Sequence, residues 1–322
     1  MRAAVVTRKG GPEVIEVADR SIPGPEPGEL LVEVTAGGVN FIDIYQREGV
    51  YPMEYPFVPG NEGAGVVEAV GDGVTEFAPG DRVGWSSTLG SFAEYCLVPA
   101  ARAVPIPEDV DLEIAAAALL QGMTAHYLAH DTFRLEPGHR CLIHAGAGGV
   151  GLLLTQMAKR LGAEVITTVG SPEKVGMSKA AGADMVIVYT ESDFVSEIES
   201  AYGPRPLDVV YDGVGAATFD KGVALLRRRG YMVTFGNASG VVEPVSPLTL
   251  MRNGSIFLTR PTLGDYIATR EELLGRASDL FGWISDGSLE VRVGGRYPLE
   301  GTAQAQVDLA SRTTTGKLIV VP

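Results

Sequence analysis

The stretch Gly146-Ala147-Gly148-Gly149-Val150-Gly151 follows the pattern G-x-G-x-x-G. The apolar residues Cys141-Leu142-Ile143 lead into it, and an amphipathic segment, Leu152–Leu161, follows it. In a strand–turn–helix unit of this kind, glycines let the backbone approach a pyrophosphate held at the N-terminus of the helix. A glycine-rich turn that serves only tight strand–helix packing is the alternative. The hexamer and its flanks predict a dinucleotide-binding turn.

After Pro137-Gly138, apolar strands and helical segments alternate along the chain. Helices are expected at Val150–Leu161 and Pro172–Ala181, after an Ala- and Leu-rich helix at Leu112–His130. This alternation predicts a parallel sheet with helices on both faces. The expected strands are Arg140–His144, Glu164–Val169, Met185–Tyr189, Asp208–Tyr211, Tyr231–Phe235 and Ile256–Thr259.

The first third of the chain has a different pattern, in which short apolar runs are separated by Gly/Pro turns. Such spacing is typical of a β-barrel or β-sandwich. The tail is mixed, with expected helices at Thr269–Ser285 and Thr302–Ser311 and a last strand at Lys317–Val321. This mixture predicts that the chain returns to the first domain. The expected strands of the first third are Arg2–Thr7, Val14–Ala18, Leu30–Thr35, Gly65–Val70, Arg82–Trp85 and Phe92–Val98.

The end of the second strand of the parallel sheet indicates which dinucleotide is bound. An NAD site places Asp or Glu there, about 20 residues beyond the glycines, to bind the ribose hydroxyls. Here the strand ends Thr167-Thr168-Val169-Gly170-Ser171, without an acid, and Lys174 follows. A cation suits a 2′-phosphate, which a carboxylate would repel. Lys174 has an alternative interpretation as a solvated helix lysine, but the missing acid favours NADP(H).

Composition excludes several other classes of protein. The chain has 26 Lys and Arg against 40 Asp and Glu, a net charge of −14, which disfavours binding to nucleic acid or anionic lipid. Its two cysteines cannot form a disulfide framework. No run of residues approaches the roughly 18 apolar residues of a membrane span, and no signal peptide is evident. We therefore expect a cytoplasmic protein that binds neither nucleic acid nor membrane.

Further motifs follow one another along the whole chain. They are Asn40-Phe41-Ile42-Asp43-Ile44-Tyr45, Tyr51-Pro52, Gly80-Asp81-Arg82-Val83, Gln121-Gly122-Met123-Thr124-Ala125, His144–Gly151, Val209–Gly215, Phe235-Gly236-Asn237 and Thr259-Arg260-Pro261. Together they resemble a known family, the zinc-free, zeta-crystallin-like quinone oxidoreductases of the medium-chain dehydrogenase/reductase superfamily. The resemblance implies an α/β fold in which a Rossmann domain with a doubly wound parallel sheet is inserted into a GroES-like, β-rich catalytic domain. The implied boundaries are 1–122 for the first part of the catalytic domain, 123–262 for the Rossmann domain and 263–322 for the return.

Zinc-dependent members of the superfamily hold a catalytic metal with Cys, His and Cys. At the matching positions this chain has Asn40, Asn61 and Gln121. Amides are poor ligands for Zn²⁺, which prefers thiolate, imidazole or carboxylate, so we expect no catalytic metal. His126 and His130 are four residues apart on an expected helix, but without a third ligand nearby they are interpreted as a polar helix face.

The resemblance also implies which residues surround the cofactor and the acceptor. Asn40 is expected beside the nicotinamide ribose and the acceptor, and Tyr45 and Tyr51 are expected to line the pocket as stacking surfaces or proton donors. The alternatives are a turn cap for Asn40 and core or rim positions for the tyrosines. Lys174, Tyr189 and Arg312 are expected at the 2′-phosphate, although Arg312 also suits the C-terminal end of a helix dipole. Expected contacts to NADPH come from Asn40, Thr124, Gly148, Gly149, Val150, Gly170, Ser171, Lys174, Tyr189, Phe235, Gly236, Asn237, Phe257, Thr259 and Arg312.

Together these observations predict an NADPH-dependent, zinc-independent quinone oxidoreductase that acts by hydride transfer. A quinone accepts hydride readily because its ring delocalises the charge, so the protein must mainly position the reactants and exclude water. A reductase of enones or alkenals is an alternative, as is an NADPH-binding structural or RNA-binding protein with little turnover. A homodimer or homotetramer is expected from the resemblance.

Overall fold

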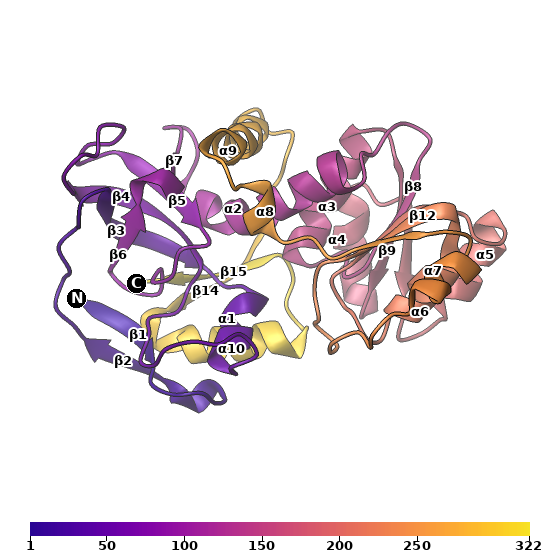
Figure 1. Cartoon of the computed structure of the whole chain (residues 1–322), viewed down its shortest axis with the longest axis horizontal. Coiled ribbons are helices and arrows are strands. Elements are labelled where there is room, and N and C mark those ends of the chain that lie inside the picture. The colour runs from indigo at the N-terminus through magenta and orange to yellow at the C-terminus, as the bar shows by residue number, and fades with distance from the viewer. The chain divides into compact units, whose positions relative to one another are not determined.

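The computed structural model describes residues 1–322, which divide into two units. Met1–Met123 and Ile267–Pro322 form the first unit, and Thr124–Tyr266 form the second. Figure 1 shows the course of the chain from indigo at the N-terminus to yellow at the C-terminus. None of the helices combines the length and the apolar character that a bilayer span requires.

The first unit is built on β3 (Glu29–Gly38), most of whose side chains are buried. This strand pairs antiparallel with β15, β4 and β6. It therefore lies at the centre of a seven-stranded sheet, in which the strand order is β14-β15-β3-β4-β5-β7 and β6 pairs with β3 alone. The C-terminal strand β15 lies directly beside β3, so the tail belongs to the first unit. The other strands are β4 (Glu62–Val70), β5 (Arg82–Ser86), β6 (Tyr95–Pro99), β7 (Ala103–Pro105), β14 (Val293–Pro298) and β15 (Lys317–Val321), and β1 (Arg2–Val6) pairs with β2 (Ile15–Asp19) in a separate ribbon.

Four helices belong wholly or mostly to the first unit. α9 begins with a capping box, in which the Thr269 hydroxyl accepts from the backbone N–H of Glu272 and the Glu272 carboxylate accepts from the backbone N–H of Thr269. Such reciprocal bonds satisfy backbone groups that the helix itself leaves unpaired. The helices are α1 (Phe41–Arg47), α2 (Leu112–Tyr127, whose last turn opens the second unit), α9 (Arg270–Ser285) and α10 (Thr302–Ser311), with short 3-10 turns η1 (Pro12–Val14), η2 (Ala100–Arg102) and η5 (Leu299–Gly301).

The second unit contains the predicted parallel sheet. All five strand pairs are parallel, in the order β10-β9-β8-β11-β12-β13. The order reverses between β8 and β11, and in open α/β sheets the crevice at such a switch point is the usual ligand site. The strands are β8 (Arg140–Ile143), β9 (Glu164–Val169), β10 (Met185–Val188), β11 (Leu207–Asp212), β12 (Leu226–Thr234) and β13 (Phe257–Thr259).

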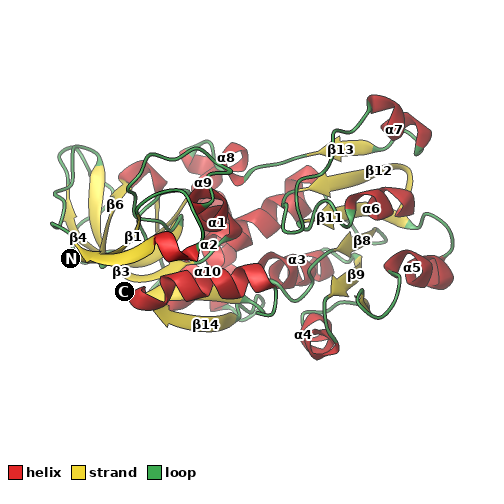
Figure 2. Ribbon diagram, turned by 90° about the horizontal axis from the view of Figure 1, so that it is seen from below, coloured by secondary structure: helices red, strands yellow, loops and turns green.

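Helices connect and cover these strands, as Figure 2 shows for β8, β9, β11 and β12. The expected helix at 112–130 ends earlier, because a turn of π-helix, η3 (Leu128–Thr132), follows α2. The remaining elements are α3 (Gly149–Arg160), η4 (Pro172–Lys174), α4 (Val175–Ala180), α5 (Phe194–Tyr202), α6 (Phe219–Leu225), α7 (Pro247–Arg252) and α8 (Leu263–Tyr266).

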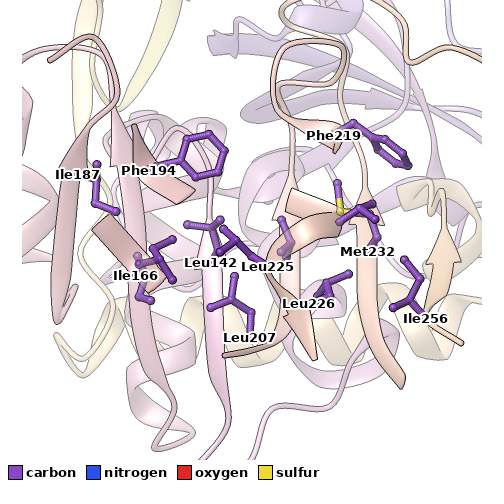
Figure 3. Close-up of a cluster of buried hydrophobic side chains, with 13 residues drawn as sticks. Leu142, Ile166, Ile187, Phe194, Leu207, Phe219, Leu225, Leu226, Met232 and Ile256 are labelled. Atoms are coloured by element: carbon purple, nitrogen blue, oxygen red, sulfur yellow. The ribbon is translucent and has the colours of Figure 1, made fainter. Parts of the chain in front are cut away.

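One face of the parallel sheet packs against α5 and α6 (Figure 3). Leu142, Ile166 and Met232 project from three strands and are almost wholly buried with Phe194 and Phe219 from the two helices. Burying an apolar side chain of this size contributes about 1.5–3 kcal/mol. This core fixes β8, whose carboxyl end leads into the glycine-rich turn, together with its neighbouring strands.

Candidate active site

The glycine-rich turn joins β8 to α3, as the sequence predicts. Gly148 is the N-cap and α3 begins at Gly149, so the N–H groups of Gly149, Val150 and Gly151 lie in the first helical turn, where no helix carbonyl can accept them. These donors and the positive end of the helix dipole suit a pyrophosphate. The turn therefore has the donors that a dinucleotide requires.

Two of the glycines are required by packing as well. A Cβ at Gly151 would collide with the carbonyl oxygen of Ala145 and lie 3.0 Å from the Cα of Gly146. A Cβ at Gly146 would lie 2.5 Å from the Cβ of Thr167 on β9. The alternative interpretation, tight strand–helix packing, thus holds for Gly146 and Gly151, and it leaves the helix start open for the predicted phosphate binding.

The predicted 2′-phosphate residues of the second unit gather at the ends of β9 and β10. Gly170 and Ser171 follow β9, and the Tyr189 backbone N–H donates to the Val169 carbonyl at 3.1 Å. The Tyr189 hydroxyl lies next to Gly170, where an added Cβ would be 3.0 Å from it. Lys174 ends η4 in the same segment, and partial burial lowers the pKa of its ammonium.

One acidic side chain, Glu173, lies in this segment too. Its carboxylate accepts a hydrogen bond from Ser171, which lowers the pKa of Glu173. The carboxylate is not at the end of β9, where an NAD site places its acid. The segment thus offers a cation, a hydroxyl and a phenol, with Glu173 as an exposed neighbour.

The loops after β11 and β12 are held together by Asp212, which is fully buried. Its carboxylate accepts from the backbone N–H groups of Val214 at 2.7 Å and Gly215 at 2.9 Å and from the Thr218 hydroxyl at 2.9 Å. The backbone N–H of Phe235 donates to the Asp212 carbonyl at 2.8 Å. This arrangement brings the predicted cofactor residue Phe235 to the carboxyl end of the sheet.

Gly236 and Asn237 follow in the same loop. A Cβ at Gly236 would lie 2.9 Å from the Cα of Gly213, so the two loops touch through their backbones. The side-chain amide nitrogen of Asn237 donates to the Gly236 carbonyl at 2.8 Å, and its amide oxygen accepts from the Arg260 guanidinium at 3.2 Å. The position of Asn237 is therefore set by Arg260, a residue that the sequence interpretation did not assign.

His144 is a buried residue at the start of the turn, and the sequence reasoning gave it no role. Its Nδ1 lies 2.8 Å from the Thr168 hydroxyl, whereas Nε2 is buried without a hydrogen-bond partner. Burial lowers the pKa of His144 to about 4, against the opposing charge of Asp212, so the imidazole is neutral at pH 7. A lone histidine at the end of a buried strand was the signal in the sequence.

The other predicted cofactor residues are spread over three elements. Phe257 and Thr259 lie on β13, where Phe257 is 49% exposed and stacks on Tyr231 with ring centroids 4.5 Å apart. Thr124 is buried in α2, at the start of the second unit. Arg312 belongs to the first unit, where it caps the C-terminus of α10 in the left-handed conformation (φ 59°).

Asn40 lies in a buried polar network of the first unit. It is the N-cap of α1, and its backbone N–H donates to the Asp43 carboxylate at 2.7 Å. Its side-chain amide donates to the Gly38 carbonyl at 3.1 Å and to Glu62 at 2.9 Å, and it accepts from Lys317 at 2.7 Å. The alternative given for Asn40, a turn cap, is therefore present, whereas its contact with cofactor and acceptor stays a prediction.

Charges within this network are almost wholly shielded from water. Glu62 and Lys317 form an ion pair whose side chains are 0% and 1% exposed, and burial lowers the pKa of Lys317. Burial also raises the pKa of Asp43 to about 6, although Asn61 and the backbone of Asn40 bond to its carboxylate. The network was not predicted, because these residues are far apart in sequence.

Tyr45 and Tyr51 lie beside each other at α1 and the loop that follows it. Their ring centroids are 6.0 Å apart in an edge-to-face arrangement, and Phe41 lies 6.1 Å from Tyr45. Tyr51 is 44% exposed. The three rings form an aromatic surface that suits a flat, apolar ligand.

The amides at the zinc-ligand positions do not suit a metal. The Asn61 amide nitrogen donates to Asp43 and to Gln46, both at 2.7 Å, and the Asn40 amide is committed to the network described above. Gln121 supplies only an amide oxygen, which is buried without a partner. None of these groups is a thiolate, imidazole or carboxylate, so this donor set does not fit Zn²⁺.

Two families match the chain by their sequence models. The alcohol dehydrogenase GroES-like domain matches residues 26–108, and the zinc-binding dehydrogenase family matches residues 149–276. The second description names a metal that the residues of this chain do not fit.

Relatives match the chain over nearly its whole length. A quinone oxidoreductase of Pseudomonas aeruginosa is 42% identical over 317 residues, 97% of each chain. A 2-haloacrylate reductase of a Burkholderia species is 38% identical over 328 residues, 99% of this chain and 98% of the relative. The crystal structure of Escherichia coli quinone oxidoreductase complexed with NADPH is 40% identical, with a TM-score of 0.98 and 100% of each chain covered.

Proposed function

Because the chain belongs to the quinone oxidoreductase family of the medium-chain dehydrogenase/reductase superfamily, we propose that it reduces quinones with NADPH by hydride transfer and without zinc. One structural observation carries the choice of cofactor. The glycine-rich turn at β8 is followed by a β9 end that has Ser171 and Lys174 and lacks the acid of an NAD site.

Residues of the second unit supply most of the proposed contacts with NADPH. Gly149 and Val150 present backbone N–H groups to the pyrophosphate, and Gly148, whose own N–H donates to the Ala145 carbonyl at 2.9 Å, has no side chain to obstruct its approach. Lys174, Tyr189 and Arg312 bind the 2′-phosphate, with Ser171 beside them. Gly170 leaves room beside Tyr189, and Phe235, Gly236 and Asn237 line the loop toward the nicotinamide. Thr124, Phe257 and Thr259 complete the proposed set. When bound, NADPH supplies the hydride.

The acceptor requires little chemistry from the protein. A quinone takes up the hydride as a delocalised anion, so the chain must hold its ring flat, exclude water and provide a proton. Tyr45 and Tyr51 serve as the stacking surface, and either phenol can donate the proton to the oxygen of the reduced ring. Asn40 holds the nicotinamide ribose beside this surface.

Steady-state kinetics test this proposal. Purified enzyme is assayed with 1,4-benzoquinone or a naphthoquinone, with NADPH and with NADH, in the presence of a chelator. We expect turnover that prefers NADPH and is insensitive to the chelator. Turnover no greater than the background reaction would overturn the proposal.

A second activity, reduction of an activated C=C bond, is favoured by one observation, the 38% identity to the 2-haloacrylate reductase. Hydride addition to such a bond leaves an enolate that must be protonated at carbon, which makes a phenol acid more important. If this activity is the main one, Tyr45→Phe or Tyr51→Phe abolishes enone reduction and spares quinone reduction. Equal effects on both substrates would argue against it.

The proposed assembly is a homodimer formed through the edge of the parallel sheet. β13 is an edge strand with unpaired backbone groups, and the neighbouring apolar residues Leu248, Met251 and Phe257 are exposed. Light scattering tests this, and a monomer at micromolar concentration would contradict it. The boundaries 1–122, 123–262 and 263–322 and the cytoplasmic location stay predictions.

A further inference from the structure

Asn40 has only one hydrogen-bonding position left for a ligand. Its two amide hydrogens are taken by the Gly38 carbonyl at 3.1 Å and the Glu62 carboxylate at 2.9 Å. Its oxygen accepts from Lys317 at 2.7 Å and also faces the backbone N–H of Asp43 in the capping box of α1, so this oxygen is the one amide atom that can still meet a ligand. Asn40 can therefore accept a hydrogen bond from a ligand but cannot donate one.

Lys317 determines which end of the amide is the oxygen. An ammonium group has three donors and no acceptor, so the amide atom that faces it must be the oxygen. Glu62, an acceptor only, faces the amide nitrogen from the other side and also binds Lys317 at 2.5 Å. The Glu62 carboxylate is itself fixed by the backbone N–H of Leu120 at 2.6 Å.

Gly38 makes room for the Lys317 and Glu62 side chains because it has no side chain of its own. A Cβ at Gly38 would lie 2.7 Å from the Cε of Lys317 and 2.7 Å from the carbonyl oxygen of Ala116. The side chains of Lys317 and Glu62 are 1% and 0% exposed, so water does not compete for their hydrogen bonds. The orientation of the Asn40 amide is thus set by two buried, opposite charges.

We propose that Lys317 is a positioning residue that, with Glu62, turns the Asn40 oxygen toward the nicotinamide ribose. This inference rests on the proposed function, because it places that ribose beside Asn40. A ribose hydroxyl can donate to the oxygen, whereas a quinone carbonyl has no hydrogen to give. Asn40 therefore orients the cofactor, and proton donation to the acceptor is left to the tyrosines.

A binding comparison separates this role from a structural one. Adenosine 2′,5′-bisphosphate carries the 2′-phosphate but lacks the nicotinamide ribose. In Lys317→Met we expect the Kd for NADPH to rise about three- to tenfold, which corresponds to one net hydrogen bond, and the Kd for the bisphosphate to change less than twofold. We expect kcat with 1,4-benzoquinone to fall about 10- to 100-fold, because a displaced nicotinamide reacts slowly.

Two further variants show whether Lys317 acts through Asn40. In the Asn40→Ala background, adding Lys317→Met should change the Kd for NADPH less than twofold, because the group it positions is gone. Lys221→Met, which removes an exposed lysine paired with Asp193, is the matched control and should behave as wild type. Lys317→Met leaves Glu62 buried without a counter-ion, so Glu62→Gln/Lys317→Met replaces it if melting curves show that the single variant is unfolded.

Several results would overturn the inference. These are equal weakening of NADPH and the bisphosphate, unchanged NADPH binding in a folded variant, and a full additional effect of Lys317→Met in the Asn40→Ala background. A wild-type enzyme that binds NADPH but does not reduce quinones would overturn the proposed function instead. In that case the binding comparison still decides the role of Lys317.

Discussion

Replacement of Gly151 by alanine tests whether the glycine-rich turn has the geometry described above. The new Cβ would lie 3.0 Å from the Cα of Gly146 and closer still to the carbonyl oxygen of Ala145. Non-bonded carbons prefer about 3.5–4.0 Å, so the turn must open by about 0.5–1 Å. Overpacking of this kind costs about 1–3 kcal/mol, which lowers the Tm by roughly 2–4 °C for each kcal/mol in a domain of this size.

The same displacement moves the N–H groups at the start of α3 away from the pyrophosphate. We expect the Kd for NADPH in Gly151→Ala to rise about tenfold or more, because several charge-assisted hydrogen bonds lengthen together. Gly275→Ala is the matched control, since its Cβ meets no atom within 4 Å in the middle of α9. The control should gain about 0.5–1 kcal/mol from helix propensity and bind NADPH normally. Wild-type Tm and Kd in Gly151→Ala would refute the reasoning.

Three other predictions concern charge and assembly. Lys174→Ala should weaken NADPH by about 1–2 kcal/mol and NADH hardly at all, measured by titration, and equal losses would remove Lys174 from the 2′-phosphate site. His144 has a pKa of about 4 when folded and 6.5 when unfolded, so only the unfolded chain gains a proton between these values, and stability falls as pH falls. From pH 7.5 to 4.5, wild type should therefore lose about 2.5 kcal/mol relative to His144→Gln in urea unfolding, whereas parallel profiles would contradict this. Met251→Lys on α7 should shift a dimer toward monomer in light scattering, and an unchanged mass would exclude this face.

Much of the fold followed from local patterns. The alternation of apolar strands and helices predicted a parallel sheet, and the segments expected at 164–169 and 150–161 match β9 (Glu164–Val169) and α3 (Gly149–Arg160) closely. Helix α1 was not predicted, because its seven residues are too short for a clear 3.6-residue period. The end of α2 was misplaced because the π-turn at Leu128–Thr132 does not change the local composition.

Some residues of the candidate site could be predicted from the sequence and others could not. Residues in contiguous motifs, such as the turn at Gly148–Val150, could be assigned from sequence because their spacing specifies the chemistry. Lys317 and Glu62 could not, since a lysine at the head of a C-terminal strand and a glutamate 255 positions earlier meet only when β15 pairs with β3. His144 is buried beside Phe194, whose ring meets the imidazole in an edge-to-face arrangement, and this contact likewise needs the tertiary structure.

The most direct test of NADPH as the cofactor is the ratio of kcat/KM for NADPH and NADH, measured with 1,4-benzoquinone on the same preparation. We expect a preference for NADPH of about 10- to 100-fold, the equivalent of about 1–3 kcal/mol from charge-assisted bonds to the 2′-phosphate. A ratio near one, or a preference for NADH, would contradict it.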